Sequence, residues 1–292
     1  MTALRLEQVD VRLDPTSASE DRRLGASLAS GEGRLAGPAL TGIDLDVATG
    51  ERLAILGPSG AGKTTLLRLF VGATVAERGS VTIDGQVLSQ RSARELRTLR
   101  ARIGFVHQDH RLVPNQRVLS NVLAGRLGRW SFLRGLREQV RPTRTHVHEV
   151  HRILERVGIP DKLYQRVDTL SGGEQQRVAI ARALFQEPDV LLADEPVSSV
   201  DPTRARETIE LLTRLADEDG TTLVVSLHDV DLARSFFPRL VGLRAGRIVF
   251  DGPTNELADD RLERLFALEP SATDDARPPR TDPSLPSGRC GQ

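Results

Sequence analysis

The segment GPSGAGKT at residues 57–64 restricts the possible folds of this chain more than any other feature. It fits the pattern G-x-x-x-x-G-K-[ST] and lies between the apolar stretch 53–56 and the apolar run TLLRLFVG at 65–72. A buried strand, a glycine-rich loop and a helix in this order let backbone N–H groups converge on phosphate oxygens, which the helix dipole also attracts. The alternative is a glycine-rich turn that carries a lysine by chance. The match at every fixed position of the pattern, in this context, disfavours it.

Two side chains of this loop are expected to act on phosphate directly. Lys63 is one of only two lysines in the chain, and it would neutralise phosphate charge, while Thr64 offers a hydroxyl to Mg²⁺. The motif therefore predicts a nucleotide-binding set that consists of Gly57, Pro58, Ser59, Gly60, Ala61, Gly62, Lys63, Thr64 and Thr65.

Short apolar segments alternate with helical patterns along the rest of the chain, which predicts an α/β fold with a mainly parallel sheet. Strands are expected at 3–13, 40–47, 51–57, 103–108, 189–194 and 221–228, with hairpins at 80–88 and 240–252. Helices are expected at 92–101, 172–188 and 202–220, and the stretch 117–167 is expected to be mainly helical. We predict one domain at 1–269, with a mobile insertion at 14–37 and a helical subdomain at about 109–170, followed by a disordered tail at 270–292.

Composition excludes several classes of protein. Forty basic residues balance forty acidic ones, so no net positive charge favours nucleic acid as a partner. A single cysteine, Cys290, excludes a disulfide framework and a multi-cysteine metal site. No run is long enough to span a membrane and no signal peptide is recognisable, so we expect a cytosolic protein.

A carboxylate pair, Asp194 and Glu195, follows the short apolar strand predicted at 189–194. The carboxyl ends of parallel strands are where ligands bind in such sheets. Asp194 could hold Mg²⁺, and Glu195 is then placed to polarise an attacking water molecule. Such a pair is often only solvated or helix-capping, but the phosphate loop upstream favours the catalytic interpretation.

The segment LSGGE at 170–174 admits two compatible interpretations. Ser171 and Glu174 have the spacing of a capping box that opens a helix. A helix N-terminus with a serine and two glycines, Gly172 and Gly173, also makes a second anion site. Two phosphate-binding surfaces in one chain suggest a head-to-tail dimer in which each nucleotide is shared between two copies.

Taken together, these motifs resemble the ATP-binding subunit of an ABC transporter over about residues 3–265. The resemblance implies a P-loop NTPase fold (ABC ATPase) with an antiparallel β subdomain, an inserted helical subdomain, and ATP and Mg²⁺ as ligands. It implies that Gln108 contacts Mg²⁺ and senses the γ-phosphate, and that Asp201 and His228 are the D-loop aspartate and the switch histidine. Ser171 and Gly173 would then meet ATP bound to the other copy. The segment SSVD, which ends at Asp201, departs from the family pattern, because leucine commonly precedes the aspartate in the family.

A finer resemblance is to the phosphonate-importer ATPases. It is carried by DHRLVPNQRVLSNVLAGRLGRW at 109–130, LRGL at 133–136 and LYQRVDTLSGGEQQRVAIARAL at 163–184. This resemblance implies an ATP hydrolase that drives an importer, held at the cytoplasmic face of the membrane by a separate permease that docks near 108–130. An external solute-binding protein is implied as an indirect partner. The alternatives are an importer ATPase for a different solute, a soluble ABC ATPase of translation or DNA repair, and a P-loop protein that regulates or binds something else.

Two further features concern residues without an assigned role. The family usually stacks adenine on an aromatic residue at the end of the first strand, where this chain has Leu13, and no aromatic residue precedes Phe70. We therefore expect weak ATP binding by the isolated subunit and poor discrimination from GTP. His146, His148 and His151 lie close together in sequence, but their spacing is not that of a helical metal site, and we expect no metal there.

Overall fold

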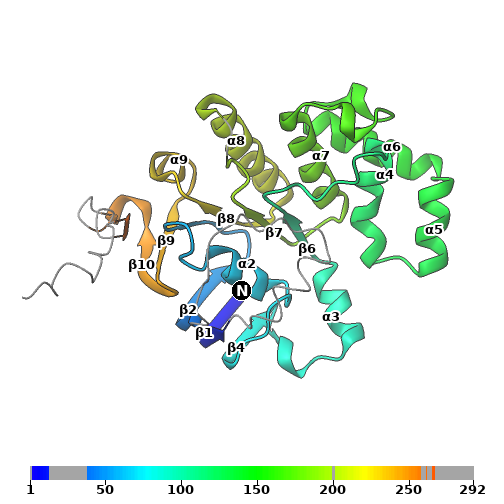
Figure 1. The fold of residues 1–292 in the computed structure, drawn as a ribbon. Coiled ribbons are helices and arrows are strands. Elements are labelled where there is room, and N and C mark those ends of the chain that lie inside the picture. Colours follow the sequence, from blue (N-terminus) through cyan, green and yellow to red (C-terminus); the bar gives the residue numbers. More distant parts are fainter. Residues whose placement is uncertain (1, 13–37, 199–200, 258–260, 262–264, 267–292) are drawn as a thin grey trace, which may run out of the picture.

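A six-stranded sheet forms the centre of the molecule, with the strand order β10-β9-β3-β8-β7-β6 (Figure 1). The computed structural model describes residues 2–12, 38–198, 201–257, 261 and 265–266 of the 292-residue chain. Neighbouring strands pair in parallel from β9 to β6, and β10 pairs antiparallel with β9. The bounds are β3 (Arg52–Leu56), β6 (Ile103–Val106), β7 (Val190–Asp194), β8 (Thr222–Leu227), β9 (Arg239–Arg244) and β10 (Arg247–Pro253).

A second, antiparallel sheet has the order β2-β1-β4-β5, with β1 (Thr2–Arg12), β2 (Pro38–Ala48), β4 (Arg78–Ile83) and β5 (Gln86–Val87). Helix α2 (Lys63–Phe70) shares a buried core with this sheet and with one face of the parallel sheet. Alternate residues of β7 divide between the two faces: Val190 and Leu192 join this core, and Leu191 and Ala193 join the core on the other face. Such a strand is buried on both sides, which is why its sequence is continuously apolar.

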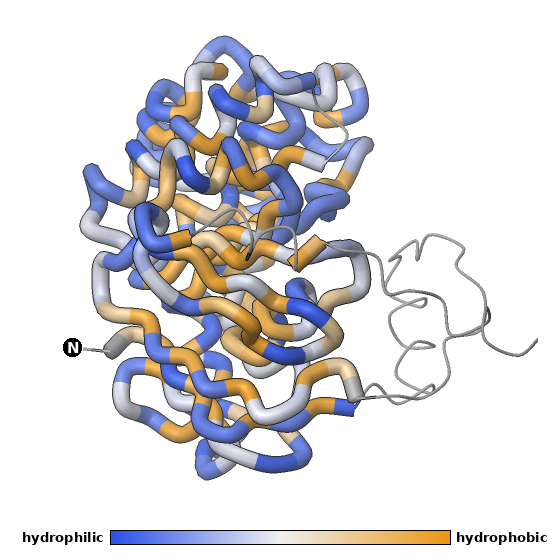
Figure 2. The backbone as a smooth tube through the Cα atoms, turned by 90° about the vertical axis from the view of Figure 1, so that its left-hand side faces the viewer, coloured by the Kyte–Doolittle hydropathy of each residue, from blue (hydrophilic) through white to orange (hydrophobic). Residues whose placement is uncertain are grey.

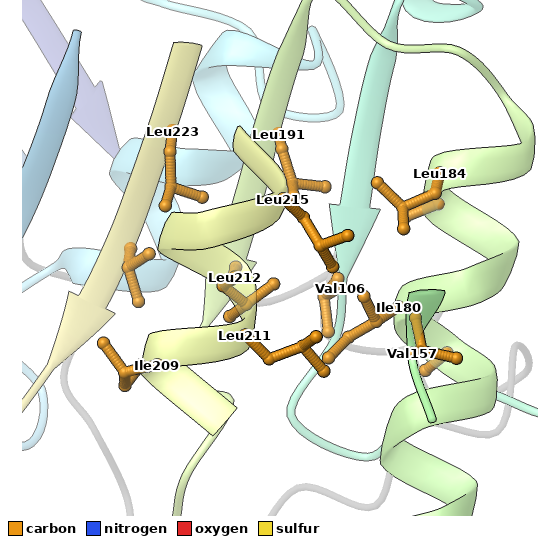
Figure 3. Packing of buried hydrophobic residues seen from close by; sticks show 14 of the residues in the cluster. Val106, Val157, Ile180, Leu184, Leu191, Ile209, Leu211, Leu212, Leu215 and Leu223 are labelled. Atoms are coloured by element: carbon orange, nitrogen blue, oxygen red, sulfur yellow. The ribbon is translucent and has the colours of Figure 1, made fainter. Parts of the chain in front are cut away.

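The core on the opposite face of the parallel sheet contains residues of five helices. They are α4 (Val118–Leu123), α6 (Arg144–Arg156), α7 (Gly172–Phe185), α8 (Pro202–Asp219) and α9 (Val230–Phe236). Figure 3 shows Leu212 and Leu215 of α8 close to Leu191 of β7, with side chains of α7 beside them. In Figure 2 the segments of apolar residues gather in the interior, and hydrophilic residues occupy much of the outline.

The helical region between β6 and α7 also contains α5 (Phe132–Val140) and the short 3₁₀ segment η2 (Ala124–Gly128). It packs closely on α7, because a Cβ atom on Gly125 of η2 would lie 2.2 Å from the carbonyl oxygen of Arg182 in α7. Trp130 is buried there, with its ring centroid 5.0 Å from that of His146 and 6.3 Å from that of Phe185. The outer end of this region is α5, beyond α4 and α6 (Figure 1).

The fold class expected from the sequence is confirmed, and so are the two hairpins. The turn of the first one contains Asp84 and Gly85, both with positive φ, and α3 (Ala93–Arg100) follows it after the 3₁₀ segment η1 (Leu88–Gln90). Helix α9 was not predicted. It is short, and Asp229 caps it by accepting a hydrogen bond of 2.9 Å from the N–H of Leu232.

The segments 14–37 and 270–292 and residue Leu13 lie outside the described residues. The domain boundaries at 1–269 and about 109–170 stay predictions. Short 3₁₀ segments complete the described part: η3 (Pro160–Lys162), η4 (Val167–Thr169) and η5 (Thr254–Glu256).

Candidate functional site

Four neighbouring parallel strands bring the predicted site residues to one edge of the central sheet. In spatial order, β3 ends at the phosphate loop, β8 at His228, β7 at Asp194 and Glu195, and β6 shortly before Gln108. Because these strands are parallel and adjacent, segments more than a hundred residues apart in sequence meet at their carboxyl ends.

The phosphate loop is held against both sheets by its glycines. A Cβ atom on Gly57 would lie 2.2 Å from the carbonyl oxygen of Leu243 in β9, which leaves no room for a side chain. Gly62 has φ +107°, and a Cβ atom there would lie 2.8 Å from the carbonyl oxygen of Ala39 in β2. No side chain caps α2, whose N-cap residue is Gly62, so the first N–H groups of this helix remain available to an anion.

Lys63 connects this loop to the end of β7. Only 4% of the residue is exposed. Its Nζ atom donates hydrogen bonds to the carbonyl oxygens of Gly57 and Pro58, at 2.8 and 3.2 Å, and lies 3.0 Å from Oε1 of Glu195. The predicted phosphate-neutralising cation and the predicted catalytic carboxylate are therefore in direct contact.

Glu195 adopts an unusual backbone conformation, with φ +42°. Positive φ is uncommon for a residue with a side chain and is found where the surrounding structure enforces it, often at functional sites. Here the N–H of Glu195 donates a 2.9 Å hydrogen bond to Oγ of Ser226 in β8. The strained residue is thus fixed from the neighbouring strand.

Asp194 is buried and accepts two hydroxyl hydrogen bonds on one oxygen. Thr64 Oγ1 donates to its Oδ1 at 3.1 Å, and Ser226 Oγ donates to the same atom at 2.9 Å. Burial raises the pKa of Asp194 above its ordinary value, and the hydrogen bonds from Ser226 and Thr64 oppose that shift. Oxygen ligands from a hydroxyl and a carboxylate are the type that hard divalent cations prefer.

Ser226 is not among the site residues predicted from the sequence, although it contacts both members of the carboxylate pair. It is fully buried near the end of β8. The available signal was a hydroxyl near the carboxyl end of the otherwise apolar run Leu223–Leu227, where the other strands present their site residues.

The segment at 171–174 forms the capping box predicted for it. The N–H of Glu174 donates to Ser171 Oγ at 3.3 Å, and the N–H of Ser171 donates to Glu174 Oε2 at 2.8 Å. Gly172 and Gly173 have no atom within 4 Å of a hypothetical Cβ, so packing within the chain does not require glycine at either position. Asp201 is the N-cap residue of α8, and its carboxylate accepts a hydrogen bond from the N–H of Arg204 at 3.1 Å.

Gln108 and His228 are exposed at the edge where the strands end, and neither side chain makes a hydrogen bond within the described part of the chain. The loop after Gln108 is strained, since His110 and Arg111 both have positive φ. Arg182 of α7 donates to the carbonyl oxygens of these two residues, at 2.7 and 2.6 Å. Burial, together with the nearby arginines, lowers the pKa of His107 to about 3, so this histidine is neutral at physiological pH.

Comparisons with known proteins agree with this geometry. A sequence model of the ABC transporter family matches residues 40–198. The chain is 46% identical over 261 residues to a phosphonates import ATP-binding protein of Pseudomonas putida, covering 89% of this chain and 93% of the relative. It is 48% identical over 255 residues to a protein of the same description from Pseudomonas aeruginosa, covering 87% and 93%.

Solved structures give the same result. The structure of cbiO1 from Clostridium perfringens, part of the ABC transporter complex cbiONQ, matches with a TM-score of 0.70 and 27% identity over 90% of this chain and 93% of that one. A bacterial ABC transporter cassette in dimeric form matches with a TM-score of 0.67 and 30% identity over 86% of this chain and 98% of that one. From its motif geometry, its family match over more than half of its length and these relatives, the chain belongs to the ABC transporter family of ATP-binding proteins.

Proposed function

We propose that this chain is the ATP-hydrolysing subunit of an ABC importer for phosphonates or a related oxyanion. The observation that carries the proposal is the convergence of Lys63, Thr64, Asp194 and Glu195 at one sheet edge, through contacts of 3.0 and 3.1 Å. The solute is supported by relatives named as phosphonate import ATP-binding proteins, because the ATPase site itself would not touch the transported molecule.

In this proposal the phosphate loop holds the β- and γ-phosphates through the N-terminal N–H groups of α2 and through Lys63. Lys63 would exchange the carbonyl oxygens of Gly57 and Pro58, and the carboxylate of Glu195, for phosphate oxygens. Glu195 would then be free to orient and polarise the attacking water. His228 and Gln108, at the ends of the neighbouring strands, would approach the γ-phosphate from either side of Glu195.

The residues present fit Mg²⁺. Thr64 and Asp194 already contact each other through ligand-type oxygens, and Gln108 offers an exposed amide oxygen. When bound, the cation would neutralise charge on the β- and γ-phosphates. It would also favour the ionised form of Asp194, which burial disfavours in the chain alone.

We propose that two copies close head to tail on two ATP molecules. Ser171, Gly172 and Gly173 would meet the nucleotide held by the other copy, and Asp201 would lie near the junction. Support comes from the open space around both glycines and from the dimeric form of a related cassette. A backbone free of side chains can approach phosphate closely.

A separate integral membrane permease completes the proposed importer, with an external solute-binding protein as an indirect partner. Among the described residues, none of the helices has the length and apolar character needed to cross a bilayer. We propose docking near the Gln108–Trp130 region, which would hold the subunit at the cytoplasmic face of the membrane.

Reconstitution tests this proposal. The chain, its permease and the solute-binding protein would be assembled in nanodiscs, and ATPase rates compared with a phosphonate, phosphate, phosphite and methionine. We expect stimulation by the phosphonate and none by methionine. Stimulation by methionine alone would contradict the proposed class of solute. An ATPase rate that does not depend on the permease would contradict the importer role.

A further inference from the structure

The turn between β9 and β10 contacts two other segments of the chain through the main chain of Gly246. The N–H of Gly246 donates a hydrogen bond of 3.0 Å to the carbonyl oxygen of Ala61 in the phosphate loop. Its carbonyl oxygen accepts a hydrogen bond of 2.8 Å from the N–H of Thr41 in β2. Gly246 is buried, whereas the preceding turn residue, Ala245, is exposed. The tip of this hairpin is therefore fixed between the phosphate loop and β2.

The turn between β4 and β5 has the same backbone conformation and serves as a comparison. Asp84 and Gly85 have φ +48° and +73° there. The corresponding values for Ala245 and Gly246 are +47° and +73°. A Cβ atom on Gly85 would meet nothing within 4 Å, and the N–H of Gly85 has no hydrogen-bond acceptor among the described residues. A Cβ atom on Gly246 would lie 2.7 Å from the carbonyl oxygen of Ala39 in β2. The two turns share a conformation, but only the second packs its glycine against other segments.

The hydrogen bond to Ala61 fixes the orientation of the peptide group that joins Ala61 to Gly62. This group is planar and trans, so its C=O and its N–H point in opposite directions. Since the carbonyl oxygen of Ala61 points at the turn, the N–H of Gly62 points away from the turn. In the part of the chain that the structure describes, this N–H has no acceptor, and it directly precedes the first N–H groups of α2. An unpaired N–H at the start of a helix is a donor for an anion.

Close packing also keeps the phosphate loop against β9 and β2. The carbonyl oxygen of Leu243 in β9 approaches Gly57, and the Leu243 side chain would lie 3.5 Å from a Cβ atom on Gly62. The carbonyl oxygen of Ala39 approaches Gly62 from the other side. The start and the end of the loop therefore both lie against main-chain atoms of neighbouring strands. A shift of the β9–β10 turn would be transmitted to the loop, because there is no free space to absorb it.

We propose that Gly246 is a positioning residue for nucleotide binding, whose N–H holds the peptide between Ala61 and Gly62 so that the N–H of Gly62 faces the β-phosphate. Gly246 itself does not touch the nucleotide and acts through the loop. Ala61 is buried, and a buried carbonyl oxygen without a donor is unfavourable, so this peptide follows the turn when the turn moves. The inference rests on the nucleotide site of the proposed function and does not depend on the solute or the permease.

The variants Gly246→Ala and Gly85→Ala form a matched pair. Both place alanine at φ +73°, so both carry the same backbone strain. Only Gly246→Ala also forces the turn away from the carbonyl oxygen of Ala39, which weakens the hydrogen bond to Ala61. We expect Gly246→Ala to weaken ADP binding by about tenfold and Gly85→Ala to leave it unchanged.

A comparison of ADP with AMP separates positioning from a general loss of structure. AMP lacks the β-phosphate, so the ratio of the two affinities measures what the β-phosphate contributes to binding. In Gly246→Ala this ratio should fall by about tenfold while the affinity for AMP is retained. Competition titrations measure both affinities, and thermal melts report the stability. A merely structural role would weaken both nucleotides equally or lower the fraction of protein that binds. An unchanged ratio in folded Gly246→Ala would overturn the proposal.

An ester at position 246 removes the hydrogen-bond donor without adding a side chain. Glycolic acid can be incorporated there by nonsense suppression in cell-free synthesis, and this variant decides the question if Gly246→Ala does not fold. The same ester at position 85 is the control, because the N–H of Gly85 has no acceptor among the described residues. We expect the ratio of ADP to AMP affinity to fall by about tenfold with the ester at 246 only. Equal ratios for the two esters would overturn the proposal. A wild-type protein that binds neither ADP nor ATP would instead contradict the nucleotide site itself.

Discussion

At the scale of single residues, the site is a set of paired charges and shared hydroxyls. Lys63 and Glu195 neutralise each other at 3.0 Å, and Asp194 shares one oxygen between Thr64 and Ser226. Each of these contacts joins two different segments of the chain. A substitution of one side chain therefore removes a contact of a residue on a neighbouring segment.

Replacing Glu195 by glutamine should stop turnover and spare nucleotide binding. The amide keeps the size of the side chain but cannot accept a proton, and loss of a general base costs about 10²–10⁴-fold in rate. ATPase rates and nucleotide titration of Glu195→Gln check this, with Glu187→Gln, an exposed carboxylate elsewhere, as control. In gel filtration Glu195→Gln should elute as an ATP-dependent dimer. A monomer with normal hydrolysis would contradict the assigned role.

Removing the hydroxyl of Ser226 should affect both carboxylates. Ser226→Ala removes a donor to Asp194 and an acceptor for the N–H of Glu195, so we expect a loss of about 1–3 kcal/mol in the free energy of unfolding. The pKa of Asp194, already raised, should rise further, which moves the acidic limb of the pH–rate profile to higher pH. Thr213→Val removes another buried hydroxyl, in α8, and should leave that profile unchanged. An unshifted limb in Ser226→Ala would refute this coupling.

At the scale of elements, two helices begin with the same capping box but are expected to differ in function. Ser92 and Glu95 open α3 with the reciprocal hydrogen bonds that Ser171 and Glu174 form at α7. Because Ser92 has the same capping role but no proposed role at a nucleotide, comparing the two serines separates the capping role of Ser171 from its proposed role at ATP.

Ser171→Ala and Ser92→Ala should therefore lose similar stability, about 0.5–2 kcal/mol each. Only Ser171→Ala should also lower the ATPase rate, since Ser171 is proposed to contact ATP bound to the other copy. Thermal melts and ATPase assays of the two variants decide. If the two variants hydrolyse ATP at the same rate, Ser171 acts only as a helix cap.

The anchoring of α5 should be sensitive to acid. Burial disfavours the ionised form of Glu138, but hydrogen bonds from His146, Thr143 and Arg137 outweigh burial and lower its pKa to about 2. Its ionised form thus stabilises the fold above the ordinary pKa of 4.5, and this contribution is lost as pH falls towards 2. Glu138→Gln should melt below wild type at pH 7, and the difference should shrink as pH falls below 4.5. A difference that is constant with pH would contradict the assignment.

The sequence predicted the elements best where pattern and motif agree. The strand before the phosphate loop and the strand before Asp194 are continuously apolar, and parallel topology brings their ends together. Helix α9 was not predicted from the sequence because its seven residues are too few to show a clear helical periodicity. The exposure of Leu133 and Leu136 in α5 could not be foreseen, since the pattern of this helix alone would place both side chains inward. The buried carboxylate of Glu138 decides the orientation, and its partner His146 lies on the next helix.

At the scale of the whole molecule, the parallel sheet separates two buried cores. One contains α2 and the antiparallel sheet, and the other contains α7 and the helical region. The phosphate loop and the capping box at Ser171 therefore belong to opposite sides of the central sheet. This arrangement leaves the start of α7 open to a second copy, as the empty surroundings of Gly173 indicate.

Mixing two inactive variants should restore activity if the dimer is head to tail. Gly173→Arg extends a side chain into open space, so it should fold normally but block approach of the other copy's nucleotide. Lys63→Ala disables the phosphate loop. A mixed dimer contains one site with an intact loop and an intact facing segment, so an equal mixture should recover up to roughly a quarter of the wild-type rate. Activity no higher than that of either variant alone would contradict a shared site.

The glycines of the phosphate loop have a consequence for how sequence variation in this protein should be read. Gly57 is closed in by Leu243 and Gly62 by Ala39, so a side chain at either position strikes main-chain atoms of a neighbouring strand before it could reach a nucleotide. A variant library scored by transport alone would mark Gly57, Gly62 and Lys63 as equally intolerant. A parallel count of folded protein would divide them, because the two glycine variants would fail in cellular abundance and the lysine variant in catalysis.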